Sequence, residues 1–270
     1  MTGRVRRLIE PLYERYLELQ CTAIPRHIAI IQDGNRRFAR EIGADTAVGH
    51  RAGADTTERL LGWACDLGVE HITLYAFSTE NFRREPAELE ELFALFREKF
   101  LAVVSDERVH RYGIRVRMVG DRGMLPPDLL EAIERAEALT AGYSRFHLNI
   151  ALAYGGRNEI VNAARRLLAD VAAGRVPVSE ISPAQVEARL AEGNDLPPVD
   201  LIIRTGNECR TSNFLPWQAN GNECAVYFCA PYWPQFRKID LLRAVRVYRQ
   251  RVAQEAAGRP ACGTVITGSR

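Results

Sequence analysis

Polar side chains follow short apolar segments at three places in the chain, and each place carries groups that bind phosphate or a hard metal ion. The first place is Asp33-Gly34-Asn35-Arg36-Arg37, where Gly34 permits a tight turn before a helix begins. Backbone amides at a helix start and the amide and guanidinium groups beside them favour a phosphate, while Asp33 supplies the oxygen ligand that magnesium prefers. An Asx turn with solvated arginines is the simpler alternative.

The second place is the segment 77–84, which combines hydroxyl, carboxamide and guanidinium groups. Ser78 and Thr79 supply the hydroxyls, Asn81 the carboxamide, and Arg83 and Arg84 the guanidiniums, a set that could take part in catalysis. Helix capping by Ser78 or by Thr79 explains the hydroxyls equally well. The full segment reads Phe77, Ser78, Thr79, Glu80, Asn81, Phe82, Arg83 and Arg84.

The third place is the segment 204–214, where Arg204 and Arg210 stand six residues apart with Ser212 close behind. The planar forks of two arginines match the oxygens of a diphosphate, and a serine adds a hydroxyl donor. Pairing with Asp200 or Glu208 is the alternative for either arginine. The presence of all three clusters in one chain favours a diphosphate site.

Two further residues are isolated in the sequence. Glu223 comes just before a predicted strand, where a lone carboxylate is ordinarily solvated. His50 lies in the segment 49–53 at the start of a predicted helix, where a histidine without a chemical role is common. Spacing alone assigns no function to either residue.

Short β-branched segments alternate with segments of helical periodicity, which predicts an α/β fold: a single domain with a central, mostly parallel six-stranded sheet flanked by helices. The predicted strands are 27–32, 71–77, 114–119, 146–154, 201–204 and 225–228, and the predicted helices include 53–67, 86–104, 127–140 and 159–173. Ligands of such sheets bind beyond the carboxyl ends of the strands, which is where the three polar clusters fall.

We expect the chain to divide into an amphipathic helix at 1–24, a catalytic domain at 25–255 and a tail at 256–270. Leu8, Leu12, Tyr16 and Leu19 recur at helical spacing in the first part. Segment 174–199 is rich in Pro, Gly and acidic residues, so we expect a surface connection with a short helix at 183–190.

Charge and composition exclude several classes of protein. A net charge of +2, from 36 basic and 34 acidic residues, is too balanced for a nucleic-acid binder, so we expect no nucleic-acid partner. The six cysteines form no C-x-x-C pair, which favours reduced thiols. No stretch has the pattern of a signal peptide or a membrane span, so we expect a protein of the cytoplasm.

The order and spacing of five motifs resemble the cis-prenyltransferase family, which includes undecaprenyl diphosphate synthase and the dehydrodolichyl diphosphate synthases. The resemblance covers residues 25–250. The motifs are HIAIIQDGNRRFA (27–39), GHRAG (49–53), YAFSTENFRR (75–84), YGGRNEI (154–160) and DLIIRTGNECRTSNF (200–214). Asp-rich motifs of the trans-prenyltransferases are absent, because the chain has no adjacent aspartates.

The resemblance implies a homodimer that uses Mg²⁺ to condense isopentenyl diphosphate with an allylic diphosphate primer. Asp33 would hold magnesium, and Glu223 would be the second metal-associated carboxylate, contributed from the facing subunit. Ser78 and Asn81 would orient isopentenyl diphosphate and assist proton loss, while the role of Glu80 stays open. The substrate-binding positions would be Gly34, Asn35, Arg36, Arg37, Phe38, His50, Phe82 and Arg84 for the primer region, and Arg204, Arg210 and Ser212 for the incoming diphosphate.

Two departures from the pattern of typical bacterial members resemble archaeal members of the family. Arg36 stands where bacterial members usually have glycine, and Asn207-Glu208-Cys209 is also more similar to archaeal than to bacterial sequences. Gln32 and Phe38 also stand where methionine and tryptophan are usual. The resemblance therefore implies geranylgeranyl or farnesyl diphosphate as primer and a long-chain polyprenyl diphosphate, the precursor of a glycosyl carrier lipid, as product.

Two alternatives share much of this sequence pattern. A short-chain synthase would have the same site residues and a shallower tunnel. A non-catalytic subunit would lack the aspartate and several arginines, whereas Asp33, Arg37, Arg204 and Arg210 are all present. An apolar stripe at 89–103 would pack in the core by default and would line a hydrocarbon tunnel in a synthase. The product implies peripheral contact with the inner face of the membrane.

Overall fold

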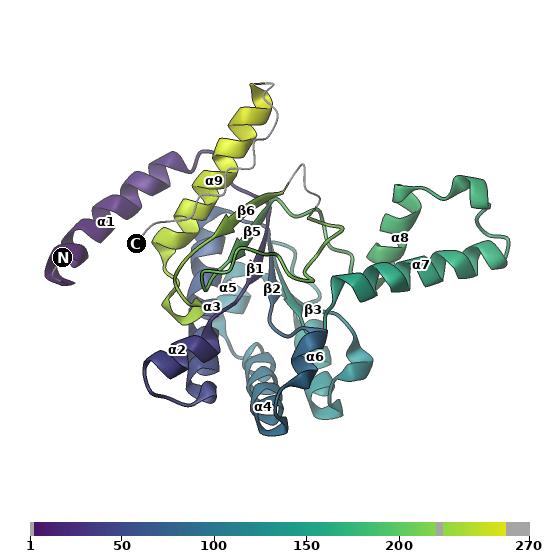
Figure 1. The fold of residues 1–270 in the computed structure, drawn as a ribbon, viewed down its shortest axis with the longest axis horizontal. Helices are drawn as coiled ribbons and strands as arrows, with labels where there is room; N and C mark the ends of the chain where they lie inside the picture. Colours follow the sequence, from purple (N-terminus) through teal and green to yellow (C-terminus); the bar gives the residue numbers. More distant parts are fainter. Residues whose placement is uncertain (1–2, 220–223, 258–270) are drawn as a thin grey trace.

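Six parallel strands form the centre of the fold (Figure 1). The computed structural model describes residues 3–219 and 224–257. The strand order is β3-β4-β2-β1-β5-β6, and every strand pair within these residues is parallel. The strands are β1 (His27–Ile31), β2 (His71–Tyr75), β3 (Ile114–Val119), β4 (Phe146–Ala151), β5 (Leu201–Arg204) and β6 (Ala225–Phe228). The predicted α/β architecture is confirmed.

Helices cover the sheet, so its central strands are buried along their whole length, as β1 and β5 are. The helices are α1 (Gly3–Gln20), α2 (Asn35–Glu41), α3 (Thr46–Leu67), α4 (Pro86–Ala102), α5 (Glu107–Tyr112), α6 (Pro127–Thr140), α7 (Gly156–Ala172), α8 (Pro183–Asn194) and α9 (Lys238–Ala256). Short 3-10 turns are η1 (Thr79–Arg83), η2 (Arg122–Met124), η3 (Val178–Glu180) and η4 (Trp233–Gln235). No helix in these ranges is long and apolar enough to cross a membrane.

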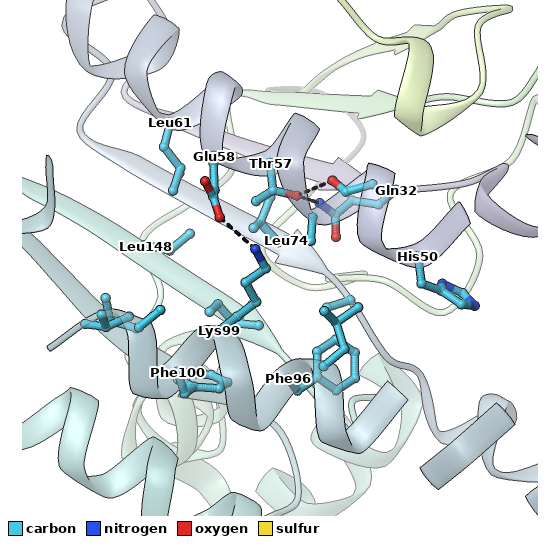
Figure 2. Close-up of a pocket in the computed structure, with 18 of the residues that line it drawn as sticks. Gln32, His50, Thr57, Glu58, Leu61, Leu74, Phe96, Lys99, Phe100 and Leu148 are labelled. Atoms are coloured by element: carbon cyan, nitrogen blue, oxygen red, sulfur yellow. Dashed lines mark hydrogen bonds and ion pairs between the residues drawn. The ribbon is translucent and has the colours of Figure 1, made fainter. Parts of the chain in front are cut away.

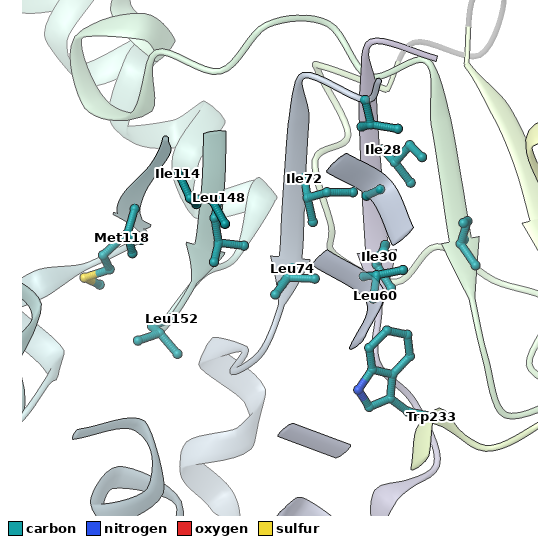
Figure 3. Packing of buried hydrophobic residues seen from close by; sticks show 14 of the residues in the cluster. Ile28, Ile30, Leu60, Ile72, Leu74, Ile114, Met118, Leu148, Leu152 and Trp233 are labelled. Atoms are coloured by element: carbon teal, nitrogen blue, oxygen red, sulfur yellow. The ribbon is translucent and has the colours of Figure 1, made fainter. Parts of the chain in front are cut away.

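The larger apolar core lies between one face of the sheet and helices α3, α4, α6 and α9. Side chains at alternate positions of the strands point into it, as Figure 3 shows for Ile28 and Ile30 of β1 and for Ile72 and Leu74 of β2. Leu60 of α3 and the fully buried Trp233 close this layer. A smaller core on the opposite face is built around Tyr154, Phe214 and Leu215.

Strand register brings the carboxyl ends of β1, β2 and β5 to one edge of the sheet. Ile31 at the end of β1 is paired with Tyr75 of β2 on one side and with Arg204 of β5 on the other. The three polar clusters of the sequence therefore begin side by side. Helices α7 and α8 pack on each other and project from the body of the molecule as an arm (Figure 1).

Candidate active site

A polar cavity of about 610 Å³ lies at this sheet edge. Twelve of the predicted site residues line it: Asp33, Gly34, Asn35, Arg36, Arg37, His50, Ser78, Asn81, Arg84, Arg204, Arg210 and Ser212. Phe38 and Phe82 do not line it, and Phe82 packs edge-on against Phe77 with ring centroids 4.9 Å apart. Glu223 lies outside the described residues.

Asp33 joins two arginines from different elements. Its Oδ1 accepts a hydrogen bond from Arg37 Nη2 at 3.0 Å, and its Oδ2 accepts one from Arg204 Nη2 at 2.8 Å. The Thr205 hydroxyl accepts from the Asp33 backbone N–H at 3.0 Å and donates to the Asp33 carbonyl at 2.7 Å. These contacts fix the carboxylate between β1 and β5 at the mouth of the cavity.

Arg204 is nearly buried, with 5% of its side chain exposed, and it holds the loop that follows β5. Its Nη1 donates to the carbonyl of Arg210 and to Oγ of Ser212, both at 2.7 Å. One guanidinium thus ties Asp33 to residues six and eight positions further along the chain. The planar fork of arginine makes this possible, because it donates in several fixed directions at once.

The same loop holds several residues in an uncommon backbone conformation. Asn207, Ser212 and Leu215 have φ angles of 58°, 54° and 45°, in the left-handed region that non-glycine residues rarely adopt. Strain of this kind persists only where surrounding contacts impose it, and it concentrates at binding sites. The bonds from Arg204 are such contacts.

Gly34 is required by the geometry of the turn between β1 and α2. Its φ angle is 112°, and a Cβ atom there would lie 2.7 Å from Cδ1 of Tyr232. The Tyr232 ring in turn lies 5.3 Å from the Arg37 guanidinium. The glycine therefore allows the aromatic ring and the first polar cluster to approach closely.

Glu88 of α4 contacts three predicted site residues, although no sequence pattern singles it out. Its Oε1 lies 3.0 Å from Arg84 Nη1, 3.4 Å from His50 Nε2 and 3.6 Å from Arg36 Nε. The Glu88 side chain is only 10% exposed. The spacing of Arg84 and Glu88, four residues apart at a helix start, was the one available indication of a pair.

Burial determines which of the residues around Glu88 are charged. Burial lowers the pKa of His50; the hydrogen bond with Glu88 opposes this shift, and the charges of Arg84 and Arg36 reinforce it. The imidazole is therefore neutral near pH 7. Burial also lowers the pKa of Arg84 while Glu88 opposes the shift. An arginine stays charged through such a shift, so Arg84 remains a cation.

The segment after β2 also lines the cavity, through Ser78, Glu80, Asn81 and Arg84. Asn81 Oδ1 accepts a hydrogen bond from the Ser78 backbone N–H at 3.0 Å, so Asn81 caps the turn η1. Glu80 accepts from Nδ2 of Asn213 at 3.0 Å, which links this segment to the loop after β5. Burial opposes ionisation of Glu80, but hydrogen bonds from its own backbone, Asn213, Ser78 and Thr79 prevail and lower its pKa.

Two buried polar atoms of the cavity residues have no hydrogen-bond partner in the part of the chain that the structure describes. They are Arg204 Nε and Asn35 Oδ1. Leaving such a group unpaired is costly, so an unpaired donor beside a cavity indicates a place for a polar ligand. Arg204 Nε carries a proton that a phosphate oxygen could accept.

An apolar cavity of about 180 Å³ adjoins the polar one (Figure 2). The two share Gln32, Asn35, His50, Ala76 and Leu92. Beyond these residues the apolar cavity runs between α3 and α4 to the sheet. Four members of the predicted apolar stripe line it, namely Leu92, Phe96, Phe100 and Val103, while Leu89 and Phe93 pack against the core.

An arrangement of this kind suits an amphiphilic ligand. Arginines from α2, from the connection between η1 and α4 and from the end of β5 converge on one polar space, which can hold strongly anionic groups. The adjoining apolar space can hold a hydrocarbon attached to them. A site with both parts binds an organic diphosphate with the diphosphate at the mouth and the hydrocarbon inside.

Comparison with known proteins yields the same family in sequence and in structure. Residues 31–255 match the family model described as putative undecaprenyl diphosphate synthase. The tritrans,polycis-undecaprenyl-diphosphate synthase (geranylgeranyl-diphosphate specific) of Halobacterium salinarum is 53% identical over 242 residues, 90% of this chain and 80% of that protein. The enzyme of the same name from Archaeoglobus fulgidus is 46% identical, over 92% of this chain and 99% of its own length.

Solved structures agree with this assignment. The crystal structure of lavandulyl diphosphate synthase from Lavandula x intermedia in complex with dimethylallyl diphosphate superposes with a TM-score of 0.79 at 33% identity, covering 84% of this chain and 95% of that one. A probable undecaprenyl diphosphate synthase from Campylobacter jejuni gives a TM-score of 0.66 at 28% identity, covering 84% and 96%. This chain belongs to the cis-prenyltransferase family of the undecaprenyl diphosphate synthases.

Proposed function

We propose that this chain condenses isopentenyl diphosphate units onto an allylic diphosphate primer to make a long-chain polyprenyl diphosphate, the precursor of a glycosyl carrier lipid. The observation that carries the proposal is the polar, arginine-rich cavity that opens into an apolar one through Gln32, Asn35 and His50. The names of the archaeal relatives specify geranylgeranyl diphosphate, and that is the primer we propose here.

The hydrogen-bond donors of the cavity fall into two groups, which supports separate positions for two diphosphates. Glu88 gathers Arg36, His50 and Arg84 on the α4 side, and we assign this group, with Gly34, Asn35 and Arg37 around it, to the primer. Arg204, Arg210 and Ser212 on the β5 side would grip isopentenyl diphosphate. Two fixed diphosphates would hold the reacting carbons close together, which lowers the entropic part of the barrier.

The remaining site residues would act on the reacting ends. Asp33 lies where the two groups of donors meet, because it contacts both Arg37 and Arg204. Ser78 and Asn81 line the opposite wall, from which they would orient isopentenyl diphosphate and assist removal of its proton. Phe38 and Phe82, outside this cavity, would act on substrate only indirectly.

Asp33 fits a magnesium site. Mg²⁺ is characteristically held by one or two carboxylates together with phosphate oxygens of a substrate, rather than by a cage of protein ligands. The donors here are of that type, because the carboxylates that line the cavity, Asp33, Glu80 and Glu208, do not gather into a cage: no group of three or more potential ligands occurs within residues 3–219 and 224–257. Bound there, Mg²⁺ would stabilise the negative charge that develops on the departing pyrophosphate.

We also propose that the protein is a homodimer. The projecting arm of α7, η3 and α8 exposes large apolar side chains, among them Leu168 at 64% and Val178 at 69%. Exposed apolar side chains gathered on one projecting element favour a protein partner. A second copy would cover them and would place Glu223 of one subunit near the site of the other, as the family pattern implies.

We further propose contact with the inner face of the cytoplasmic membrane, which the product and helix α1 support. Its outer side exposes Ile9, Leu12, Tyr16 and Leu19, with Leu12 at 74%, while Leu17 on the inner side is buried against Ile239 and Leu242 of α9. A helix with an outward apolar stripe binds at a lipid interface. Release of a polyprenyl product would then require lipid or detergent.

The proposal is tested by incubating the protein with radiolabelled isopentenyl diphosphate and Mg²⁺. Dimethylallyl, geranyl, farnesyl and geranylgeranyl diphosphates are offered in parallel, and the products are sized by chromatography. A ladder ending in a long polyprenol, most abundant with geranylgeranyl diphosphate, is the expected result. A single short product would indicate a short-chain synthase. Absence of incorporation by folded protein would favour a non-catalytic subunit.

A further inference from the structure

The apolar cavity has a charged wall on one side. Most of its lining is aliphatic or aromatic, but Glu58 of α3, Lys99 of α4 and Asp106 before α5 also line it. Figure 2 shows Glu58 and Lys99 pointing toward one another from the two facing helices. Charges are unexpected in a space suited to hydrocarbon, because burying them without water is costly.

These charges form a continuous set of ion pairs. Lys99 Nζ lies 2.8 Å from Oε1 of Glu58, and Arg108 Nη2 lies 2.9 Å from Oε2 of the same carboxylate. Arg108 also contacts Asp106 at 2.7 Å. Glu58 therefore links α3 to α4 and to α5, and both of its oxygens are occupied.

The Glu58 carboxylate is held in its ionised form. Partial burial opposes ionisation, but the hydrogen bonds from Lys99 and Arg108 outweigh it and lower the pKa of Glu58. The side chains of Glu58 and Lys99 are 37% and 33% exposed, so they keep part of their hydration. A hydrocarbon pressed against them would remove that water and gain nothing in return.

The ion pairs lie away from the diphosphate end, at a partly solvent-exposed part of the cavity wall. His50 belongs to both cavities, and Glu58 comes eight residues later on the same helix, about 12 Å along its axis at about 1.5 Å per residue. Leu148 and Ile114 line the apolar cavity and do not line the polar one. A chain growing inward from His50 thus meets aliphatic walls first and charges later.

We propose that the Glu58–Lys99 ion pair sets the length of the product. The inference rests on the proposed function, in which the hydrocarbon is pushed inward by one isoprene unit at each condensation. Each unit gains free energy by leaving water as long as the wall is apolar. At the ion pair this gain ends, because a further unit must displace the water around two charges. Product release then becomes faster than a further condensation. The position of a polar boundary, rather than a bulky side chain, therefore fixes the chain length.

The test compares Lys99→Met with Arg51→Met. Methionine removes the charge of Lys99 but keeps an unbranched apolar stem, and Glu58 retains Arg108 as its partner. Arg51 forms an ion pair with Glu98 at 3.1 Å between the same two helices, yet neither residue lines the cavity and both are more than half exposed. The control therefore weakens a tie between α3 and α4 without changing the cavity wall. A third variant, Lys99→Arg, keeps the ion pair.

The readout is the distribution of product lengths at equal extents of reaction, measured by mass spectrometry of the dephosphorylated polyprenols. We expect Lys99→Met to shift the maximum to longer products by at least one isoprene unit, and Arg51→Met and Lys99→Arg to leave it in place. Thermal melting checks that every variant is folded, and Lys99→Gln replaces Lys99→Met if the latter is not.

Three results would overturn the inference. If Lys99→Met and Lys99→Gln are folded and active and give the same product lengths as the parent protein, the charge of Lys99 does not control product length. An equal shift of product length in Arg51→Met would indicate that the spacing of α3 and α4, rather than the charge of Lys99, causes the effect. An unmodified protein that makes no prenyl product would overturn the proposed function together with the inference, whereas the first two results leave the proposed function intact.

Discussion

Replacing Arg204 by alanine should damage both the fold and the binding of isopentenyl diphosphate, whereas the same change at Arg210 should damage binding alone. The contrast follows from burial. The Arg204 side chain is 5% exposed and donates to Asp33, to the Arg210 carbonyl and to Ser212. The Arg210 side chain is 66% exposed and contacts Glu208 at 3.0 Å.

The magnitudes can be worked from these contacts. All three bonds have the charged guanidinium as donor, and a hydrogen bond that involves a charged group contributes about 1.5 to 3 kcal/mol. Asp33 keeps Arg37 as a partner at 3.0 Å and is itself 28% exposed, so part of the free energy of the bond to Asp33 is recovered. Arg204→Ala should therefore lower the free energy of unfolding by at least about 3 kcal/mol. Arg210→Ala should change it by less than about 0.5 kcal/mol, as is usual for an exposed side chain.

The assays are urea denaturation and the dependence of turnover on isopentenyl diphosphate. Loss of one charged donor to a diphosphate costs about 1.5 to 3 kcal/mol, so the KM for isopentenyl diphosphate should rise about 10- to 100-fold in both variants. An unchanged KM in folded Arg204→Ala would refute the clamp. A wild-type unfolding midpoint in that variant would refute the structural role, and equal destabilisation by both variants would refute the contrast in burial.

Three further predictions concern the metal, acid stability and the membrane. Asp33→Ala should abolish most turnover while circular dichroism stays unchanged, and normal activity in a folded variant would contradict the magnesium assignment. Burial lowers the pKa of His27 and of His71 to about 4. Because the unfolded value is near 6.5, the fold should keep its full stability above that pH and lose about 2 to 3 kcal/mol from His27 as the pH falls toward 4. Urea midpoints equal at pH 7 and pH 4.5 would contradict this. Leu12→Glu combined with Leu19→Glu should reduce sedimentation with lipid vesicles and leave activity in detergent intact, and undiminished sedimentation would exclude α1 as the contact.

The strands could be predicted from the sequence because buried parallel strands are continuous apolar segments. Strands β3, β5 and β6 have the predicted bounds. Strands β2 and β4 end earlier than predicted, since apolar residues such as Phe77 and Tyr154 continue past the last pair of the ladder and are buried by side-chain packing instead. An apolar residue can belong to the strand ladder or can be buried by packing beyond its end, and composition alone does not distinguish the two.

Helix α9 was not predicted, although it is one of the longest helices. Its sequence, KIDLLRAVRVYRQRVAQEA, is crowded with arginines that lower its apolar character. The buried stripe that includes Leu241, Leu242 and Val245 is nevertheless sufficient to pack against the sheet and α1. Tertiary packing, rather than local propensity, accounts for this helix.

The site was predictable to the extent that strand ends determine it. A polar residue at or just beyond the carboxyl end of a strand has a known place once the sheet is parallel. This applies to Arg204 at the end of β5, to Asp33 shortly after β1 and to Ser78 shortly after β2. Glu88 and Thr205 were missed for different reasons. Glu88 sits on a helix whose pattern only predicts a polar face, and Thr205 acts through backbone bonds to Asp33 that no sequence pattern specifies.

The carboxylates of the site explain how so many cations can stand together before any substrate arrives. Uncompensated arginines within one cavity would repel each other and open it. Every arginine predicted to bind substrate instead contacts a carboxylate: Arg36 and Arg84 contact Glu88, Arg37 and Arg204 contact Asp33, and Arg210 contacts Glu208.

Such pairing fixes the direction of each guanidinium while leaving donors free, as the unpaired Nε of Arg204 illustrates. A diphosphate entering the cavity then meets donors that are already oriented, and it need not order five flexible side chains. The same carboxylates compete with it for the arginines, so binding must draw on the free donors and on the apolar cavity beside them. On this reasoning a short-chain or purely inorganic diphosphate should bind weakly, because it lacks the hydrocarbon that supplies the remaining free energy.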